Sequence, residues 1–255
     1  MEATYEDLAG HLVSKLKSLP SDSRYLVAVS GIPGSGKTTL ANEVGTRVNV
    51  RWKREGTDAA AAGQDVAIVM PMDGFHLTRA QLDAFENREE AHHRRGAHWT
   101  FDPDGTCSSL GCPLLNSQPT RSSAVNLLLR RPLTSETVTI TGPSFDHAVK
   151  DPVEHDIKIE PHHKLIIVEG IYLHLSHPDP WPGLADLFDG RWFITVDLAV
   201  ARERVARRHV RTGLTSTYEL GLHRFDTNDG LNAQFILDNR MPATREIVSV
   251  QEQGI

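Results

Sequence analysis

The chain has little of what disulfide scaffolds, membrane proteins and general nucleic-acid binders need. Its 255 residues include only two cysteines, Cys107 and Cys112, too few for a disulfide framework or, without further ligands, for a zinc site. No run approaches 18 uninterrupted apolar residues, so we expect no membrane span. The formal charge of -6 argues against a nonspecific nucleic-acid binder. The 39% hydrophobic and 24% charged residues are typical of a globular protein with a real core.

A targeting signal is also missing from the first residues. Met1 to Asp7 is acidic and has no apolar stretch, which argues against a secretory signal or a basic transit peptide. We therefore expect free thiols in a reducing compartment and a cytoplasmic protein that does not associate with membranes. The sequence leaves open whether the chain acts as a monomer or as a homodimer.

The most informative stretch that is present is residues 31–38, which read GIPGSGKT and fit the P-loop pattern G-x-x-x-x-G-K-[ST]. It follows an apolar run, 25–29, and precedes a helix-compatible run, 39–44. Glycines let backbone N–H groups point at phosphate oxygens, and the helix N-terminus adds partial positive charge. Lys37 can reach the outer phosphates and the Thr38 hydroxyl can bind Mg²⁺. The predicted nucleotide-binding residues are Gly31, Ile32, Pro33, Gly34, Ser35, Gly36, Lys37, Thr38 and Thr39.

Apolar strands alternate with helical segments along the chain. The predicted strands are 25–29, 66–70, 164–170, 191–197 and 246–250, with a short strand at 138–140, and the predicted helices are 5–19, 80–88, 199–211 and 231–240. This alternation predicts a P-loop NTPase fold of the α/β class: three α/β/α layers around a mainly parallel five-stranded sheet. We expect a single P-loop domain over 1–255, in which the segment 105–142 is an insertion or a substrate-side loop.

Two carboxylates follow predicted strands, where ligands gather in such sheets. Asp73 ends the second strand and could accept a proton from an acceptor hydroxyl. Its alternative role is that of a turn-forming Asp in an Asp-Gly pair. Glu169 ends the third strand, in the position of an acid that holds Mg²⁺ directly or through water. Its alternative role is that of a capping or loop acid.

Arginines crowd the predicted helix 199–211. Three of them, Arg204, Arg208 and Arg211, recur at helical spacing and share a face, which could close over the phosphates as an arginine-bearing lid. The alternative is a solvated basic helix. The histidine- and arginine-rich stretch 92–98 fits either a polar substrate contact or a charged surface.

Taken together, these motifs resemble the P-loop kinase superfamily that contains uridine kinase, phosphoribulokinase and bacterial-type pantothenate kinase. The likeness is strongest to its uridine kinase-like, or fructose kinase-like, branch and runs from about residue 25 to 250. The matching segments are the P-loop, DGFH at 73–76, RGA at 95–97 with TFD at 100–102, PSFDH at 143–147, VEGIY at 168–172, and RTG at 211–213. The P-loop alone is generic, whereas the ordered set is much more specific.

The resemblance implies a role for several further residues. Asp73 and Lys37 would be catalytic, with Arg208 and Arg211 in the lid, and Thr38 and Glu169 would lie at the metal. Asn232 and Ala233 match an Asn-Ala element near the end of the catalytic domain. The residues that would border the acceptor substrate are His76, Arg95, Phe145, Asp146, His147 and Tyr172. Uridine kinases carry Tyr-Asp where this chain has Phe145 and Asp146, which puts recognition of a nucleoside base in doubt.

The sequence thus predicts an ATP- and Mg²⁺-dependent kinase that phosphorylates a hydroxyl group of a small metabolite, such as a nucleoside, a sugar or a vitamin-like alcohol. One alternative is a nucleotide-binding regulatory protein on a degenerate kinase fold, although Lys37, Thr38, Asp73 and Glu169 are all intact. Another is a GTPase-type switch, but the chain has no N-K-x-D guanine motif.

Overall fold

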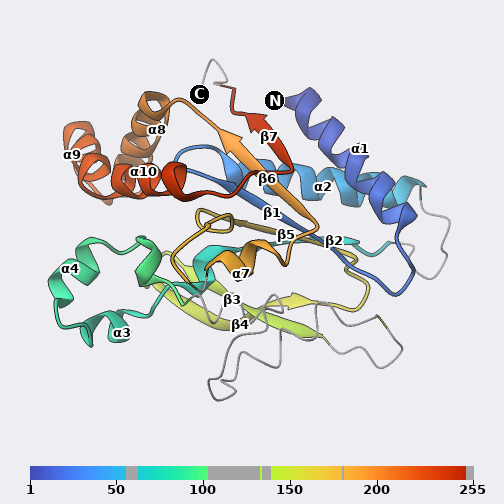
Figure 1. Ribbon diagram of the computed structural model, residues 1–255, viewed down its shortest axis with the longest axis horizontal. Helices are drawn as coiled ribbons and strands as arrows, with labels where there is room; N and C mark the ends of the chain where they lie inside the picture. Colours follow the sequence, from blue (N-terminus) through green and yellow to red (C-terminus); the bar gives the residue numbers. More distant parts are fainter. Residues whose placement is uncertain (56–62, 103–132, 134–138, 180, 251–255) are drawn as a thin grey trace.

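Five parallel strands form the central sheet of the protein in the computed structural model (Figure 1). The structure describes residues 1–55, 63–102, 133, 139–179 and 181–250. The sheet has the order β2-β5-β1-β6-β7. Its strands are β1 (Tyr25–Gly31), β2 (Ala67–Pro71), β5 (Leu165–Gly170), β6 (Gly190–Thr195) and β7 (Arg245–Val248). The predicted five-stranded parallel sheet is confirmed, and each predicted strand is found to within one or two residues.

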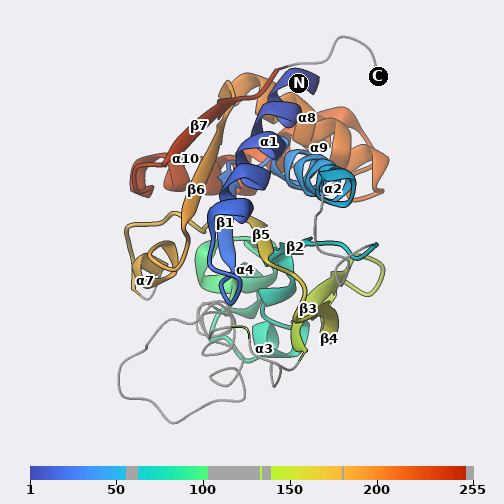
Figure 2. The same ribbon diagram turned by 90° about the vertical axis from the view of Figure 1, so that its right-hand side faces the viewer.

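Helices cover both faces of this sheet (Figures 1 and 2). Alternate residues of β1 point to opposite faces: Val27 and Val29 pack with α1 (Glu2–Ser18) and α2 (Lys37–Glu55). Leu26 and Ala28 belong to a second core cluster. That cluster includes residues of α7 (Trp181–Ala185), α8 (Leu198–Arg211) and α10 (Gly230–Asn239). In the described part of the chain, no helix is long and apolar enough to cross a membrane.

The predicted helix 80–88 is wrong, because two short helices occupy this region. Thr78 caps α3 (Arg79–Asp83) by a reciprocal pair of hydrogen bonds with Gln81. Asn87 then accepts a hydrogen bond from the Glu90 amide and starts α4 (Arg88–His93). A side chain that caps a new helix at Asn87 is incompatible with a helix running through it.

An antiparallel hairpin stands apart from the central sheet and was missed by sequence reasoning, apart from a short strand predicted at 138–140. It consists of β3 (Ile140–Asp146) and β4 (Asp151–Ile159). The Asp146 carboxylate accepts hydrogen bonds from the amides of Ala148 (2.7 Å) and Val149 (3.3 Å), which shapes the turn between the strands. Most of the predicted insertion at 105–142, with Cys107 and Cys112, lies outside the described residues.

Close backbone contacts attach this hairpin to the end of β2. The short 3-10 helix η1 (Met72–Phe75) follows β2, and a Cβ atom on its Gly74 would lie only 2.3 Å from the Pro143 carbonyl oxygen of β3. Gly74 therefore lets the hairpin pack directly on the backbone that carries Asp73.

Replacing Gly74 with alanine should destabilise the protein, because the added methyl group overlaps a backbone carbonyl that cannot move aside cheaply. We expect a loss of about 1–3 kcal/mol, the usual cost of overpacking, or about 2–4 °C in Tm per kcal/mol for a chain of this size. Thermal unfolding measures the effect. Gly190→Ala is the matched control, because its Cβ would have no neighbour closer than 3.5 Å. Equal Tm values for the two variants would contradict the packing described here.

Candidate active site

The P-loop adopts a backbone that glycine alone accommodates easily. Gly34 and Gly36 have φ values of +83° and +91°, in the left-handed region. A Cβ on Gly34 would also lie 2.7 Å from the Ala201 carbonyl oxygen, so the loop packs tightly against the start of α8. Because α2 begins at Lys37, its N-terminal amides follow directly on the loop. This is the arrangement that binds phosphate groups.

Side chains of the P-loop face the end of β5. The Thr38 hydroxyl donates a hydrogen bond to Oε2 of Glu169 (3.1 Å). Lys37 is half-buried beside this pair, and the Ser35 hydroxyl is buried with no hydrogen-bond partner in the described part of the chain. The P-loop after β1 and the end of β5 thus bring together a hydroxyl, a carboxylate and an amine at the carboxyl ends of the strands.

Glu169 is the electrostatic centre of this arrangement. Only 5% of the residue is exposed, and this burial raises the pKa of its carboxyl group. The negative charge of Asp73 raises it further, whereas Lys37, the Thr38 hydrogen bond and Arg208 lower it. Lys37, Asp73 and Arg208 therefore lie close enough to Glu169 to affect its pKa. This agrees with the expectation that these residues gather at the carboxyl ends of the strands.

Asp73 lies on η1 with its side chain exposed. Its carbonyl oxygen, not its carboxylate, takes part in the local structure: it accepts from the His76 amide (3.2 Å) and lies 2.8 Å from Nδ1 of the His76 ring. The backbone is thus held by His76 while the residue is exposed to solvent.

Several of the predicted acceptor-binding residues cluster next to Asp73. The His76 ring lies 3.9 Å from the Phe101 ring and 5.0 Å from the Phe145 ring, measured between centroids. The His147 ring is 5.2 Å from Phe145, and the Arg95 guanidinium lies 5.5 Å from the same ring. Burial lowers the pKa of His76, Asp73 opposes this effect, and the positive charge of Arg95 adds to it.

Three of the predicted acceptor residues, with Arg95 among them, make structural contacts. Tyr172 is fully buried and its hydroxyl donates to the Gly96 carbonyl oxygen (2.7 Å). Asp146 shapes the hairpin turn, as described above. Arg95 donates to Oδ1 of Asp151 (3.0 Å) and to the carbonyl oxygens of Leu77 (2.7 Å) and Lys150. These contacts hold the wall of the cluster in place, and direct contact of these side chains with a substrate stays a prediction.

The arginines of α8 have different surroundings. Arg204 donates to the Gly34 carbonyl oxygen (3.2 Å) and the Ser249 hydroxyl (2.9 Å), so it holds the P-loop backbone. Arg207 points to Tyr218, 5.5 Å from its ring. Arg208 and Arg211 are exposed, and the positive charge of Arg208 lowers the pKa of Glu169. Sequence reasoning missed the contact between Arg204 and the P-loop, because helical spacing reports a shared face and not a partner 170 residues away.

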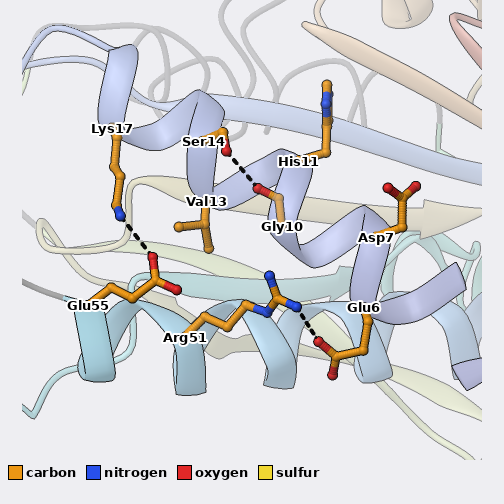
Figure 3. Close-up of a pocket in the computed structure, with 9 residues that line it drawn as sticks. All are labelled: Glu6, Asp7, Gly10, His11, Val13, Ser14, Lys17, Arg51 and Glu55. Carbon is orange, nitrogen blue, oxygen red and sulfur yellow. Dashed lines mark hydrogen bonds and ion pairs between the residues drawn. The ribbon is translucent and has the colours of Figure 1, made fainter. Parts of the chain in front are cut away.

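A separate hollow of about 600 Å³ lies between α1 and α2 (Figure 3). Four of its charged side chains pair with one another, Lys17 with Glu55 (2.8 Å) and Arg51 with Glu6, and Asp7 pairs with Arg245 of β7. None of the predicted site residues lines it. Internal pairing and distance from the carboxyl ends of the strands make it a poor candidate for phosphate chemistry.

Comparison with known proteins finds relatives along almost the whole chain. The chain is 36% identical over 249 residues to a candidate uridine kinase of Schizosaccharomyces pombe, which covers 98% of this chain and 91% of that protein. It is 41% identical over 171 residues to the ATP-dependent kinase-like protein notR' of Aspergillus versicolor, covering 67% of this chain and 90% of that protein. No family model matches the chain.

The fold matches the crystal structure of YFH7 from Saccharomyces cerevisiae, described as a candidate P-loop kinase with a circular permutation. The TM-score is 0.73 at 23% identity, over 98% of this chain and 99% of that chain. The 36% identity to the Schizosaccharomyces pombe protein over almost the whole chain shows that the protein belongs to the P-loop kinases related to uridine kinase, as its motifs indicated.

The raised pKa of Glu169 predicts that Glu169→Gln stabilises the protein at neutral pH. An acid whose pKa is higher in the folded state than its ordinary value of 4.5 costs stability once it ionises, and this cost is absent below pH 4.5. Gln keeps an oxygen for Thr38 but carries no charge. We expect a higher Tm at pH 7, by about 2–4 °C for each kcal/mol relieved, and a difference that disappears as the pH falls below about 4.5.

Thermal unfolding of both proteins between pH 4 and pH 8 checks this. Glu203→Gln on the exposed side of α8 is the control and should leave Tm nearly unchanged at every pH. A Glu169→Gln protein less stable than the parent at pH 7 would show that the attraction of Lys37 and Arg208 outweighs burial.

Proposed function

We propose that the protein is an ATP- and Mg²⁺-dependent kinase that phosphorylates a hydroxyl group of a small metabolite. The observation that carries this proposal is the pair formed by Thr38 and Glu169 beside Lys37, with Asp73 close enough to affect the same carboxylate. Phosphoryl transfer needs positioned charge more than covalent chemistry, and this edge of the sheet supplies charges of both signs.

The P-loop amides and Lys37 would hold the β- and γ-phosphates of ATP. Thr38 and Glu169 fit Mg²⁺, because this ion is bound in proteins by one or two oxygen ligands together with substrate phosphates. No group of three or more His, Cys, Asp or Glu side chains within the described ranges could hold a metal ion by itself. A site that relies on the nucleotide for its remaining ligands agrees with that. When bound, Mg²⁺ would neutralise phosphate charge.

Asp73 would orient the acceptor hydroxyl and take its proton as the acceptor oxygen bonds to the γ-phosphorus and ADP leaves. The cluster of His76, Phe145, His147 and Arg95 beside Asp73 would hold the acceptor. Arg208, on the Glu169 side of α8, and the neighbouring Arg211 would stabilise charge on the transferring group. The mix of aromatic rings and cations suits a polar organic alcohol, and nucleosides, sugars and vitamin-like alcohols are the classes to test.

Two substitutions separate nucleotide binding from transfer. Lys37→Ala should abolish turnover because the phosphates lose their cation. Asp73→Asn should retain ATP binding but lower kcat about 10²–10⁴-fold, the usual contribution of a general base. ATP consumption measured against a panel of nucleosides, sugars and vitamins, with detection of the phosphorylated product, identifies the acceptor and supplies the assay.

Asp83→Asn is the matched control for Asp73→Asn, because Asp83 is a surface acid on α3 that contacts His92 (2.8 Å). It should keep parental kcat. An Asp73→Asn protein with unchanged kcat would remove Asp73 from the role of base. Tight ATP binding without phosphorylation of any panel member would favour a regulatory nucleotide-binding protein instead.

A further inference from the structure

A π-helical turn, η3 (Phe225–Asp229), joins α9 (Tyr218–Arg224) to α10. It is closed by a hydrogen bond from the Gly230 amide to the Phe225 carbonyl oxygen, five residues back. Such turns are rare within helices and occur often at functional sites, because the inserted residue redirects the side chains that follow. Here the turn carries three polar side chains with long-range partners: Asp226, Asn228 and Asp229.

Two of these side chains attach the turn to α8. Arg202 of α8 donates from Nε and Nη2 to the two oxygens of Asp226, each at 2.6 Å. His209 of α8, 5% exposed, places Nε2 3.5 Å from Oδ2 of Asp229. Helix α9 packs closely on the same helix, since a Cβ on Gly221 would lie 2.7 Å from the Ala206 carbonyl oxygen. Helix α8 and the π-turn are therefore one packed unit.

The third side chain, Asn228, reaches the opposite way, to the acceptor side of the site. It is 3% exposed. Its Oδ1 accepts from Nε of Arg94 (3.1 Å), and its Nδ2 donates to the Arg95 carbonyl oxygen (3.3 Å). Asn232 accepts a second hydrogen bond from Arg94, at Nη2 (3.0 Å). A buried amide that uses both its donor and its acceptor on two consecutive residues fixes where that backbone lies.

The backbone that Asn228 holds is the loop 94–96. This loop carries Arg95, which lies against Phe145, and Gly96, whose carbonyl oxygen accepts from Tyr172. Gly96 has a φ of +109°, a conformation that other residues adopt only with strain. Local hydrogen bonds, such as that from the Gly96 amide to the Thr100 hydroxyl (2.9 Å), shape the loop, and Asn228 adds a contact from the side of α8.

The same unit touches the nucleotide loop at its other side. Arg204 of α8 donates to the Gly34 carbonyl oxygen, and Gly34 packs on Ala201. Helix α8 thus contacts the P-loop directly and the acceptor loop through Asn228.

We propose that Asn228 is a positioning residue that ties the acceptor loop 94–96 to α8, so that nucleotide binding at the P-loop orders the acceptor loop. This inference rests on the proposed function, which makes residues 31–38 the nucleotide site and loop 94–96 part of the acceptor site. It adds a coupling between the two sites and assigns it to a residue outside both.

Hydrogen–deuterium exchange with and without the Mg²⁺ complex of a non-hydrolysable ATP analogue tests the coupling without a known acceptor. In the parent protein the analogue should slow exchange in peptides from 31–40 and also in peptides from 94–101. We expect the slowing at 94–101 to be about 5-fold or more, the lower end of typical coupling between sites. In Asn228→Ala the slowing at 31–40 should remain and that at 94–101 should disappear.

Two further variants make the test specific. Asn228→Asp keeps the acceptor for Arg94 but loses the donor to the Arg95 carbonyl oxygen, so it should retain part of the response and provides a second variant if Asn228→Ala does not fold. Gln234→Ala should keep the full response. Gln234 is exposed on α10, and within the described residues its side chain hydrogen-bonds to Asp238 alone.

The outcomes separate the two proposals. If the analogue slows exchange at 31–40 but not at 94–101 in the parent, the coupling is wrong and the kinase proposal stands. The same conclusion follows if the analogue slows exchange in both segments of Asn228→Ala as much as it does in the parent. Faster exchange at 94–101 in Asn228→Ala with an unchanged response to the analogue would show a purely structural role, which also overturns the inference. No response at 31–40 in the parent would overturn the proposed function and this inference together.

Discussion

The hydrogen bond between Thr38 and Glu169 is the interaction on which the site depends. It joins the first turn of α2 to the end of β5, and these two elements are 131 residues apart in the chain. The pairing of β1 with β5 sets the two elements side by side, with Val29 opposite Glu169. Because the carboxylate is buried, its charge is costly, and Lys37, Arg208 and the hydroxyl offset part of that cost. The charge of Glu169 and the shape of the P-loop edge are therefore maintained together.

The central strands β1 and β5 could be predicted from sequence because they are buried on both faces. Residues of β1 and β5 are almost all inaccessible, and such strands read as continuous apolar runs. The hairpin gave no such signal. Much of β4 is exposed, and prolines at 143 and 152 argue against a strand in a single sequence. Gly74 lets the hairpin pack on η1, and no local sequence pattern encodes this contact.

The residues of the candidate site also fall into a group that could be predicted from sequence and a group that could not. Lys37, Thr38, Asp73 and Glu169 follow strands or lie in a motif with a known mechanism, so their convergence could be expected from topology alone. The supporting contacts could not. Arg204 was predicted as a lid residue by helical spacing, yet it holds the P-loop carbonyl. Asn228 and Arg94 are 134 residues apart, and no spacing rule connects them. Sequence patterns identify the reactive groups, whereas three-dimensional packing decides what holds them.

Three glycines lie so close to a neighbouring residue that a Cβ atom would not fit, and these contacts hold the segments that carry the reactive groups. Gly34 packs on Ala201, Gly74 on Pro143 and Gly170 on Met72, where a Cβ would lie 2.7, 2.3 and 2.4 Å from the nearest atom. Each contact fixes one carrier of a reactive group: the P-loop, η1 with Asp73, and the end of β5 with Glu169. At Gly34 and Gly74 the neighbour is a backbone carbonyl oxygen, which has little freedom to adjust because it lacks the rotamers by which side chains relieve strain, whereas at Gly170 the neighbour is the Met72 side chain. These contacts hold the P-loop, η1 and the end of β5 in place, and the hydrogen bond between Thr38 and Glu169 joins two of these three segments.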